Sequence, residues 1–343
     1  MLNKLLGKFS QDLGIDLGTK NTLVYTIDKG IVLSEPSVVA VNTRTDEILT
    51  VGEEARKMVG KTPSHIQAIK PLVDGVISDF EASEKMIKYF INKVHVNKFT
   101  LAPRPRVVIG IPLDITEVEK KAVEDAAKSA GAREVFLIEE SMAAAIGAKM
   151  PVSEPTATMI VDIGGGTTEI AVISLGGVVT WKALKLAGNA MDNDIVEYIR
   201  EEFNILIGEQ TAEEVKIKIG SSTALKEPME MEVRGRDLFS GLPNAVTVNS
   251  GQIQEAIDKT IKQIIDNIKS TIESTPPELV ADIYKQGIYI TGGGALLRGL
   301  DKKIAGITKI PVRIADDPLT CVVRGTGILL ADIELLKKVT GRD

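Results

Sequence analysis

Two short segments of the sequence each place an aspartate just before a turn rich in glycine and threonine. In the first, an apolar run carries Asp16 and leads into Gly18-Thr19-Lys20-Asn21-Thr22. In the second, a similar run carries Asp162 and leads into Gly164-Gly165-Gly166-Thr167-Thr168. Glycine lets a backbone turn with positive φ and approach an anion closely. Successive N–H groups of such a turn can point at one site, and threonine adds hydroxyl donors.

These two turns favour the binding of a polyphosphate. Asp16 and Asp162 supply carboxylates that can hold hydrated Mg²⁺, an ion that usually keeps several of its waters. Two such turns facing each other would hold a polyphosphate from both sides. One copy alone is more simply explained as a tight hairpin turn. The presence of two related copies favours the phosphate interpretation.

Two further segments could contact a nucleoside. Gly292-Gly293-Gly294-Ala295 follows a predicted strand and opens a predicted helix from Ala295, so its backbone could pack against a purine or receive a phosphate. Strand–glycine–helix turns are, however, common in α/β proteins. Glu213 and Lys216 lie one turn apart on a predicted helix. They could reach a ribose and a base, but their spacing alone favours an exposed ion pair.

Glu139 and Glu140 end a predicted strand and precede an alanine-rich helix. A carboxylate there could orient a water for attack on a γ-phosphate, because phosphoryl transfer depends on positioning and electrostatics. Thr167 could help to hold that water. The alternative is a pair of acids favoured by the dipole at the start of a helix.

Two other nucleotide motifs are rejected. Residues 55–62 match a relaxed Walker A pattern, but helix formers occupy the loop positions and Pro63 disfavours helical geometry at Thr62. No G-x-G-x-x-G follows a predicted strand, which argues against a dinucleotide fold.

The elements around these motifs repeat. Each aspartate turn joins two strands, and a further glycine turn, at 28–30 or 176–177, leads to a third. Strands are then predicted at 106–111, 135–138 and 287–291, and helices at 116–131, 141–149 and 252–274, the first with a Thr116–Glu119 capping box. This repetition predicts two similar α/β domains. Residues 33–74 and 185–245 read as smaller insertions.

Composition excludes several classes of protein. The chain has 343 residues, 44% of them hydrophobic, and a formal charge of −6, as in an ordinary globular protein. Cys321 is the only cysteine, so no intrachain disulfide forms, and with two histidines it cannot build a His/Cys zinc site. The mild acidity argues against a nucleic-acid partner. No apolar run is long enough to span a membrane, and the first ten residues predict no cleavable signal.

The first ten residues carry an apolar stripe and two lysines. The stripe is formed by Leu2, Leu5, Leu6 and Phe9. Lys4 and Lys8 fall on the opposite side of a helix. Such a segment could fold on an anionic membrane surface, with the stripe at the acyl boundary. The alternatives are a helix docked on its own domain and a frayed tail.

The three glycine motifs resemble the phosphate-one, phosphate-two and adenosine motifs of the actin/heat-shock chaperone/sugar-kinase superfamily. Longer strings narrow the resemblance to the MreB family of bacterial actin-like cell-shape proteins: 30–40 (GIVLSEPSVVA), 74–80 (DGVISDF), 275–279 (TPPEL) and 291–298 (TGGGALLR). The match covers essentially the whole chain. It implies an α/β, actin-like duplicated ATPase fold of two lobes with a nucleotide cleft between them.

The resemblance implies ATP and Mg²⁺ as cofactors and weak ATP hydrolysis coupled to filament assembly. It assigns phosphate contacts to Gly18–Thr22 and Gly164–Thr167, nucleoside contacts to Glu213 and Lys216, and adenine contacts to Gly292–Ala295. Glu140 and Thr167 would position the hydrolytic water, while Asp16 and Asp162 would act on Mg²⁺ through water. The implied partners are further copies of the chain, in paired head-to-tail protofilaments, the inner membrane surface, RodZ, MreC and MreD. The filaments would direct peptidoglycan synthesis during elongation.

The resemblance also implies a division into subdomains and a second membrane contact. The expected parts are a membrane helix (1–10), subdomain IA (11–32, 75–142, 320–343), IB (33–74), IIA (143–184, 246–319) and IIB (185–245). Phe99 and Leu101, apolar residues in a loop bounded by Lys98 and Pro103, could form the second membrane contact. The alternative is an ordinary loop whose apolar side chains fold inward.

Three residues depart from the family pattern: Lys20 replaces a small residue, Ser141 a proline, and Asn189 an acid in the turn that starts a helix. Asparagine at position 189 is still expected to cap that helix. Lys20 could touch phosphate or point to solvent, and Ser141 makes the corner after Glu140 less rigid. Two functions compete with the polymer: a monomeric phosphotransferase, which needs an acceptor pocket, and a chaperone-like ATPase, which needs a further substrate domain.

Overall fold

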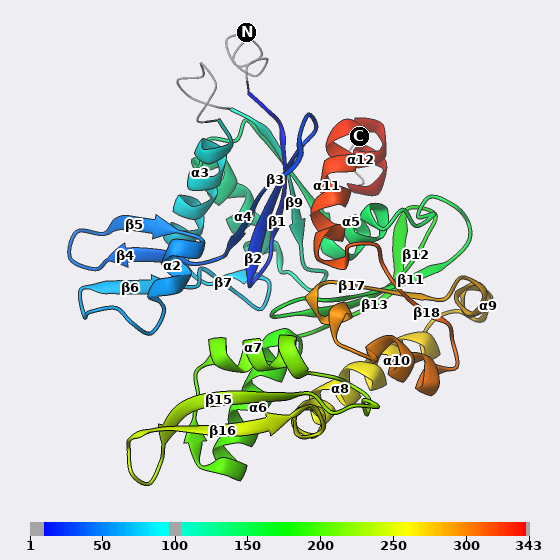
Figure 1. Ribbon diagram of the computed structural model, residues 1–343. Helices are drawn as coiled ribbons and strands as arrows, with labels where there is room; N and C mark the ends of the chain where they lie inside the picture. Colours follow the sequence, from blue (N-terminus) through cyan, green and yellow to red (C-terminus); the bar gives the residue numbers. More distant parts are fainter. Residues whose placement is uncertain (1–9, 96–103, 341–343) are drawn as a thin grey trace. The chain divides into compact units, whose positions relative to one another are not determined.

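A computed structural model describes residues 10–95 and 104–340 of the chain (Figure 1). These residues form two compact units. The first unit holds residues 10–95, 104–155, 173–178 and 319–340, and the second holds 156–172 and 179–318. Each unit is described by itself below. The finer division into four subdomains stays a prediction.

A five-stranded sheet lies at the centre of the first unit. Its strands are β1 (Leu13–Leu17), β2 (Asn21–Thr26), β3 (Gly30–Pro36), β9 (Arg106–Ile111) and β10 (Glu134–Glu139). The order is β10-β9-β1-β2-β3, with β1, β2 and β3 antiparallel and with β9 and β10 parallel to β1. Leu13, Ile15, Val107 and Ile109 are fully buried in this sheet, so the short apolar runs of the sequence form its core.

The second unit repeats this arrangement. Its sheet contains β11 (Thr158–Ile163), β12 (Thr168–Ser174), β13 (Gly177–Leu184), β17 (Ile288–Thr291) and β18 (Val312–Ile314). Residues 173–178, which include the end of β12 and the start of β13, are assigned to the first unit. The order is β13-β12-β11-β17-β18. Strand β17 runs parallel to β11, and β18 runs parallel to β17. In both sheets a three-strand meander is extended by two parallel strands beside its first strand. The predicted duplication is therefore confirmed.

Helices of the first unit pack closely where small residues permit it. The helices are α2 (Glu53–Met58), α3 (Phe80–His95), α4 (Glu117–Ser129), α5 (Glu140–Gly147), α11 (Cys321–Ala331) and α12 (Ile333–Thr340). The predicted Thr116–Glu119 capping box is present at α4. Helices α5 and α11 lie side by side, and a Cβ at Gly147 or Gly325 would overlap the backbone of the facing helix (Figure 1). This contact fixes the helix that begins at Glu140.

The two insertions form small three-stranded sheets. The first contains β4 (Val39–Asn42), β5 (Glu47–Val51) and β6 (Ile66–Ile69), followed by the hairpin of β7 (Leu72–Val73) and β8 (Val76–Ile77). The second contains β14 (Ile205–Leu206), β15 (Glu230–Asp237) and β16 (Pro243–Asn249). Residues 55–58 of the Walker-like string belong to α2, which agrees with its rejection as a phosphate loop.

The second unit has five α-helices among its described residues. They are α6 (Gly188–Phe203), α7 (Glu209–Ile219), α8 (Ser250–Glu273), α9 (Pro277–Gln286) and α10 (Leu300–Thr308). Single 3₁₀ turns occur at η1 (Gly293–Leu296) and η2 (Pro318–Thr320). Helix α8 buries a stripe that includes Ile253, Ile257, Ile261, Ile264 and Ile268 in the hydrophobic core of this unit, as its amphipathic pattern predicts.

Two local expectations were wrong. The helix predicted from Ala295 is only the 3₁₀ turn η1, because the next residues are extended and Arg298 pairs with Ser221 before α10 begins at Leu300. Asn189 does not cap α6. The N-cap residue is Ala187, with no side-chain cap, and the amides of Gly188 and Asn189 bond to carbonyls of the turn at 164–165.

Candidate functional site

The second unit brings two of the three glycine motifs to one sheet edge. Strands β11 and β17 are parallel neighbours with Asp162 opposite Thr291, so the turns that follow them begin at the same level. A Cβ at Gly292 would overlap Asp162 Oδ1 and the carbonyl oxygen of Ile163, and one at Gly294 would overlap the Ile163 side chain. Gly292 also has φ +77°, a conformation that favours glycine. Only glycine fits this junction.

The turn at 164–167 is held from behind by the start of α6. The Gly164 amide donates to the Thr167 carbonyl at 2.9 Å, which closes the turn. The amides of Gly188 and Asn189 donate to the carbonyls of Gly164 and Gly165 at 3.1 and 2.7 Å. In a trans peptide the C=O and the N–H point in opposite directions. The N–H groups of Gly165 and Gly166 therefore point away from α6, as donors for an anion.

Asp162 is a carboxylate in an apolar strand. Its side chain is buried at the end of β11, and this burial raises its pKa to about 7. A buried carboxylate is costly when charged unless it is paired or lies near a metal. A cation near Asp162 would therefore stabilise its charged carboxylate, which fits the prediction that Asp162 acts on a hydrated Mg²⁺.

Helix α7 carries Glu213 and Lys216, the two predicted nucleoside contacts. The Lys216 ammonium donates to the Gly188 carbonyl at 2.7 Å and pairs with Asp192 of α6 at 2.6 Å. The pair is largely buried, with 14% of the Lys216 side chain and 3% of the Asp192 side chain exposed. Lys216 is therefore not part of an exposed pair, as the spacing had suggested, because its side chain is largely buried. Glu213 lies on the same helix and is half-buried.

The first unit builds the turn at 18–22 on a small buried network. The Ser37 hydroxyl donates to the Gly18 carbonyl at 2.6 Å, and the Ser37 amide donates to the Lys20 carbonyl at 2.9 Å. Thr19 Oγ1 accepts from the Gly75 amide at 2.9 Å. Thr22 is fully buried, with its hydroxyl 2.9 Å from Ser37 Oγ. Thr22 thus supports the turn from behind.

Glycine is again required in this turn, and Asp16 lies beside it. A Cβ at Gly18 would come 2.7 Å from the Asn21 carbonyl oxygen and 3.7 Å from Asp16 Oδ1. Because position 18 has no side chain, a ligand of the turn can approach its backbone closely.

Glu140 is the first residue of α5, directly after β10. Its Cγ lies over Gly110 of the neighbouring β9, where a Cβ would come within 3.2 Å. Ser141, which follows, is fully buried. Burial raises the pKa of the neighbouring Glu139 carboxyl, and Lys120 partly opposes this shift. The first unit thus places Asp16 and the turn at 18–22 at the carboxyl end of β1, and Glu140 at the carboxyl end of β10, with β9 between these two strands.

The described residues contain no group of three or more histidine, cysteine, aspartate or glutamate side chains that could hold a metal ion. A metal cage made of protein side chains alone is therefore not found in this part of the chain. Mg²⁺ commonly takes one or two carboxylates and completes its shell with waters and phosphate oxygens. The single aspartate at each turn suits that mode of binding.

Several residues in contact with these turns were not predicted. They are Ser37, Gly75, Gly188 and Pro318, whose carbonyl accepts from the Gly292 amide at 2.9 Å. Asp192, which pairs with Lys216, was not predicted either. Ser37 and Gly75 lie inside strings that carry the family resemblance, which could have identified them. Asp192 and Lys216 are far apart in sequence, so spacing gave no signal.

The predicted membrane residues lie outside the described part of the chain. These are Leu2, Leu5, Leu6, Phe9, Phe99 and Leu101. Within residues 10–95 and 104–340, no helix is long and apolar enough to cross a membrane.

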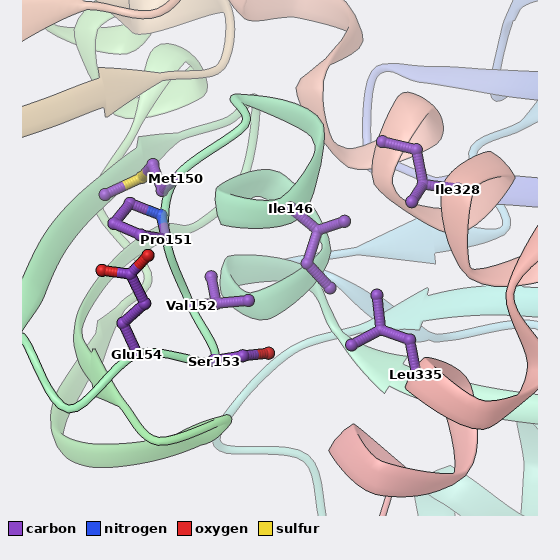
Figure 2. Close-up of a pocket in the computed structure, with 8 residues that line it drawn as sticks. All are labelled: Ile146, Met150, Pro151, Val152, Ser153, Glu154, Ile328 and Leu335. Atoms are coloured by element: carbon purple, nitrogen blue, oxygen red, sulfur yellow. The ribbon is translucent and has the colours of Figure 1, made fainter.

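A separate hollow lies in the first unit, with a volume of about 240 Å³ (Figure 2). It is lined by Ile146 of α5, Ile328 of α11, Leu335 of α12 and residues 150–154. Figure 2 shows mostly aliphatic side chains around it, with Ser153 and Glu154 as the polar ones. This mostly apolar lining, with an acidic residue, does not suit a polyphosphate, and none of the predicted site residues lines the hollow.

Comparison with known proteins decides the family. The family model described as MreB/Mbl protein matches residues 10–338. The chain belongs to the MreB/Mbl family. The cell shape-determining protein Mbl of Bacillus subtilis (strain 168) is 50% identical over 330 residues, which cover 96% of this chain and 98% of Mbl. The cell shape-determining protein MreB of Escherichia coli (strain K12) is 50% identical over 339 residues, 98% of this chain and 97% of that one.

Solved structures agree with this assignment. MreB5 of Spiroplasma citri bound to ADP superimposes with a TM-score of 0.90 at 39% identity, over 96% of this chain and 98% of that one. A structure described as a MamK double helical filament has a TM-score of 0.79 at 24% identity, over 94% and 99% of the chains, and it supports the fold alone. The predicted family and the predicted actin-like α/β fold are both confirmed.

Proposed function

We propose that this member of the MreB/Mbl family binds ATP with Mg²⁺, hydrolyses it slowly and assembles into filaments that determine rod shape. The observation that carries the proposal is the paired glycine turns after Asp16 and Asp162, each built on the same strand of a duplicated sheet. Relatives at 50% identity are named cell shape-determining proteins. MreB5, at 39–40% identity, has been solved with ADP and with AMPPNP.

The residues around the turns suit a nucleotide. Gly165 and Gly166 direct amides away from α6, and Gly18 leaves room for close approach in the first unit. The turn at 292–295 lies against the end of β11, where an adenine would receive backbone contacts on the same unit as the phosphate turn. Lys20, Asn21 and Glu213 are proposed to complete the contacts.

Hydrolysis is proposed to depend on Glu140 and Thr167. Bound Mg²⁺ would neutralise charge on the phosphate oxygens and favour in-line attack by water. Glu140, at the start of α5, accepts a hydrogen bond from that water and orients it, while the Thr167 hydroxyl holds it in place. Asp16 and Asp162 would hold the hydrated ion through its waters. The packing of α5 on α11 limits the movement of Glu140.

The filaments are proposed to lie on the inner face of the cytoplasmic membrane, where they direct peptidoglycan synthesis. The apolar stripe and the lysines of residues 1–9 support the membrane contact, with Phe99 and Leu101 as a second one. The main proposed partner is a further copy of this chain. Head-to-tail contacts between unlike surfaces of successive copies generate an open filament. RodZ, MreC and MreD are proposed partners on the basis of family membership.

Sedimentation tests this proposal. The purified chain is centrifuged over a wide range of concentrations with Mg-ATP, with Mg-ADP and with EDTA, and phosphate release is followed in parallel. Pelleting that requires Mg-ATP and rises above a threshold concentration is expected. A chain that stays monomeric throughout but turns over ATP would instead support a phosphotransferase. A chain that binds no nucleotide would refute the proposal altogether.

A further inference from the structure

Lys216 is engaged with the backbone that supports the phosphate turn. Its ammonium lies 2.7 Å from the Gly188 carbonyl oxygen and 2.6 Å from Asp192 Oδ1, both on the first turns of α6. A Cβ at Gly188 would come 3.3 Å from Lys216 Nζ and 3.2 Å from the Gly164 carbonyl oxygen. Lys216, the start of α6 and the turn therefore form one tightly packed contact.

The contact continues into the turn itself. Gly188 accepts from Lys216 through its carbonyl and donates to Gly164 through its amide, at 3.1 Å. The next amide, that of Asn189, donates to Gly165 at 2.7 Å. Because these bonds orient the peptides of Gly164 and Gly165, a shift of Gly188 would re-aim the N–H groups of Gly165 and Gly166. Ala187, the N-cap residue of α6, contributes no side-chain hydrogen bond that would fix the helix start in another way.

A buried ion pair is poor evidence for a role in stability. Removing two charges from water costs about as much as their attraction returns, and apolar replacements are often neutral or stabilising. Lys216 and Asp192 are more simply explained as groups that hold a specific geometry, in this case that of the start of α6.

Helix α7 is also tied to the third glycine motif. The Arg298 guanidinium donates to the carbonyls of Ile217 and Gly220 at 3.2 and 3.0 Å, at the end of α7. Arg298 follows the turn at 292–295 by three residues. One helix thus contacts the support of the phosphate turn through Lys216 and the segment after the adenosine turn through Arg298.

We propose that Lys216, paired with Asp192, is a positioning residue for the phosphate-binding turn at 164–166, acting through the Gly188 carbonyl. This inference rests on the proposed nucleotide binding and differs from the nucleoside contact that the family resemblance implies for Lys216. A nucleoside contact would stabilise all adenine nucleotides equally. A positioning role acts on the phosphates that the turn binds.

The ratio of two dissociation constants tests the difference. The affinities of the full chain for ATP and for AMP are measured with Mg²⁺ for the natural protein and for Lys216→Met. A positioning role lowers the preference for ATP over AMP by about tenfold, the effect of losing one charge-assisted hydrogen bond. Lys216→Arg, which keeps a charged donor for both partners, restores most of the preference. Lys218→Met, on the same helix with an exposed partner Glu214, is the matched control and leaves the ratio unchanged.

Amide hydrogen exchange of the nucleotide-free protein gives a second measurement. In Lys216→Met, amides of peptides that cover 164–166 and 188–189 exchange faster, while the turn at 18–22 in the other unit is unaffected. If Lys216→Met does not fold, Asp192→Asn replaces it. That variant keeps the lysine but removes the charge that fixes it, and is expected to shift the same ratio and the same amides.

The possible results separate the two proposals. Equal weakening of ATP and AMP with unchanged exchange at 164–166 would overturn the positioning role and support a nucleoside contact. A natural protein that prefers neither nucleotide would also overturn it, since the turn would then bind no β- or γ-phosphate. A natural protein that binds neither ATP nor AMP would refute the proposed function itself.

Discussion

Gly292 lies directly against the carboxylate of Asp162. A Cβ at position 292 would overlap Asp162 Oδ1 and the carbonyl of Ile163, and φ at Gly292 is +77°. The turn after β17 is thereby seated on the end of β11, where the phosphate turn begins. The close approach of these two residues holds the turns at 164–167 and 292–295 together, so that under the proposed function one nucleotide would contact both.

Replacement of Gly292 by alanine is expected to destabilise the protein. A left-handed conformation for a residue other than glycine costs about 1–3 kcal/mol, and the overlap with backbone atoms of Ile163 adds to that cost. The unfolding temperature and the affinity for ATP should both fall. The control is Gly306→Ala in α10, where nothing lies within 4 Å of a Cβ. That change should raise stability by about 0.5–1 kcal/mol. Equal unfolding temperatures for the two variants would contradict the close packing at 292.

Asp162→Asn is expected to stabilise the nucleotide-free protein at neutral pH. The folded-state pKa of Asp162 is about 7, above the ordinary value of 3.8. The folded protein therefore binds more protons than the unfolded chain between these values, and its stability falls as pH rises through this range. Asparagine removes that penalty, which reaches at most about 4 kcal/mol above pH 7. The variant and the natural protein should unfold alike near pH 4 and diverge towards pH 8, in EDTA.

Asp258→Asn is the control of opposite sign. Lys262, followed by Lys303, lowers the pKa of Asp258 through hydrogen bonds. Its charge therefore contributes stability above its unfolded pKa, and that stability is lost as pH falls through the folded pKa. Asp258→Asn should be less stable than the natural protein at pH 7, with the difference vanishing in acid. If Asp162→Asn behaves in the same way as Asp258→Asn, the carboxyl of Asp162 is not destabilised by burial.

Much of the fold was predictable because its signals are local. The runs at 13–17 and 159–163 are short, mostly apolar and followed by glycine, and they form β1 and β11 with every apolar side chain buried. The repeated order of strand and turn predicted the duplication that both sheets show. The capping box at Thr116 depends on side chains three residues apart and was also correct.

The errors occurred where distant segments decide the conformation. A helix was predicted from Ala295, but the Ser222 amide bonds to the Arg298 carbonyl at 2.8 Å and draws the chain into an extended shape. Lys216 pairs with Asp192 on another helix, and an i, i+3 spacing could not reveal that pair. The Gly and Asp residues of the site were visible in the sequence. The atoms that hold their turns in place were not, because they come from long-range packing.

Glu140→Gln is expected to slow phosphate release by about a hundredfold, the scale of a lost general base. ATP affinity should stay close to that of the natural protein, because Gln keeps the size and hydrogen-bonding capacity of the side chain. The matched control is Glu139→Gln, one residue earlier at the end of β10. Its carboxyl has a pKa raised by burial, yet its loss should leave turnover nearly unchanged. If phosphate release is slow in Glu139→Gln and normal in Glu140→Gln, Glu139 and not Glu140 orients the water.

Removal of residues 1–9 is expected to weaken binding to anionic liposomes without affecting nucleotide binding. The deleted stripe of Leu2, Leu5, Leu6 and Phe9 contributes about 1.5–3 kcal/mol for each side chain that becomes fully buried. The loss in a flotation assay should therefore exceed about tenfold.

Two substitutions separate charge from apolar contact in this membrane binding. Lys4→Gln with Lys8→Gln should reduce binding at low salt and have little effect at high salt, because attraction to anionic lipid is screened. Phe99→Ser with Leu101→Ser should weaken binding at both salt concentrations if that segment forms the second contact. Liposome binding that survives removal of residues 1–9 but is lost in the Phe99 and Leu101 variant would assign the anchor to the second segment. Binding that survives both changes would exclude the two segments as the membrane contact.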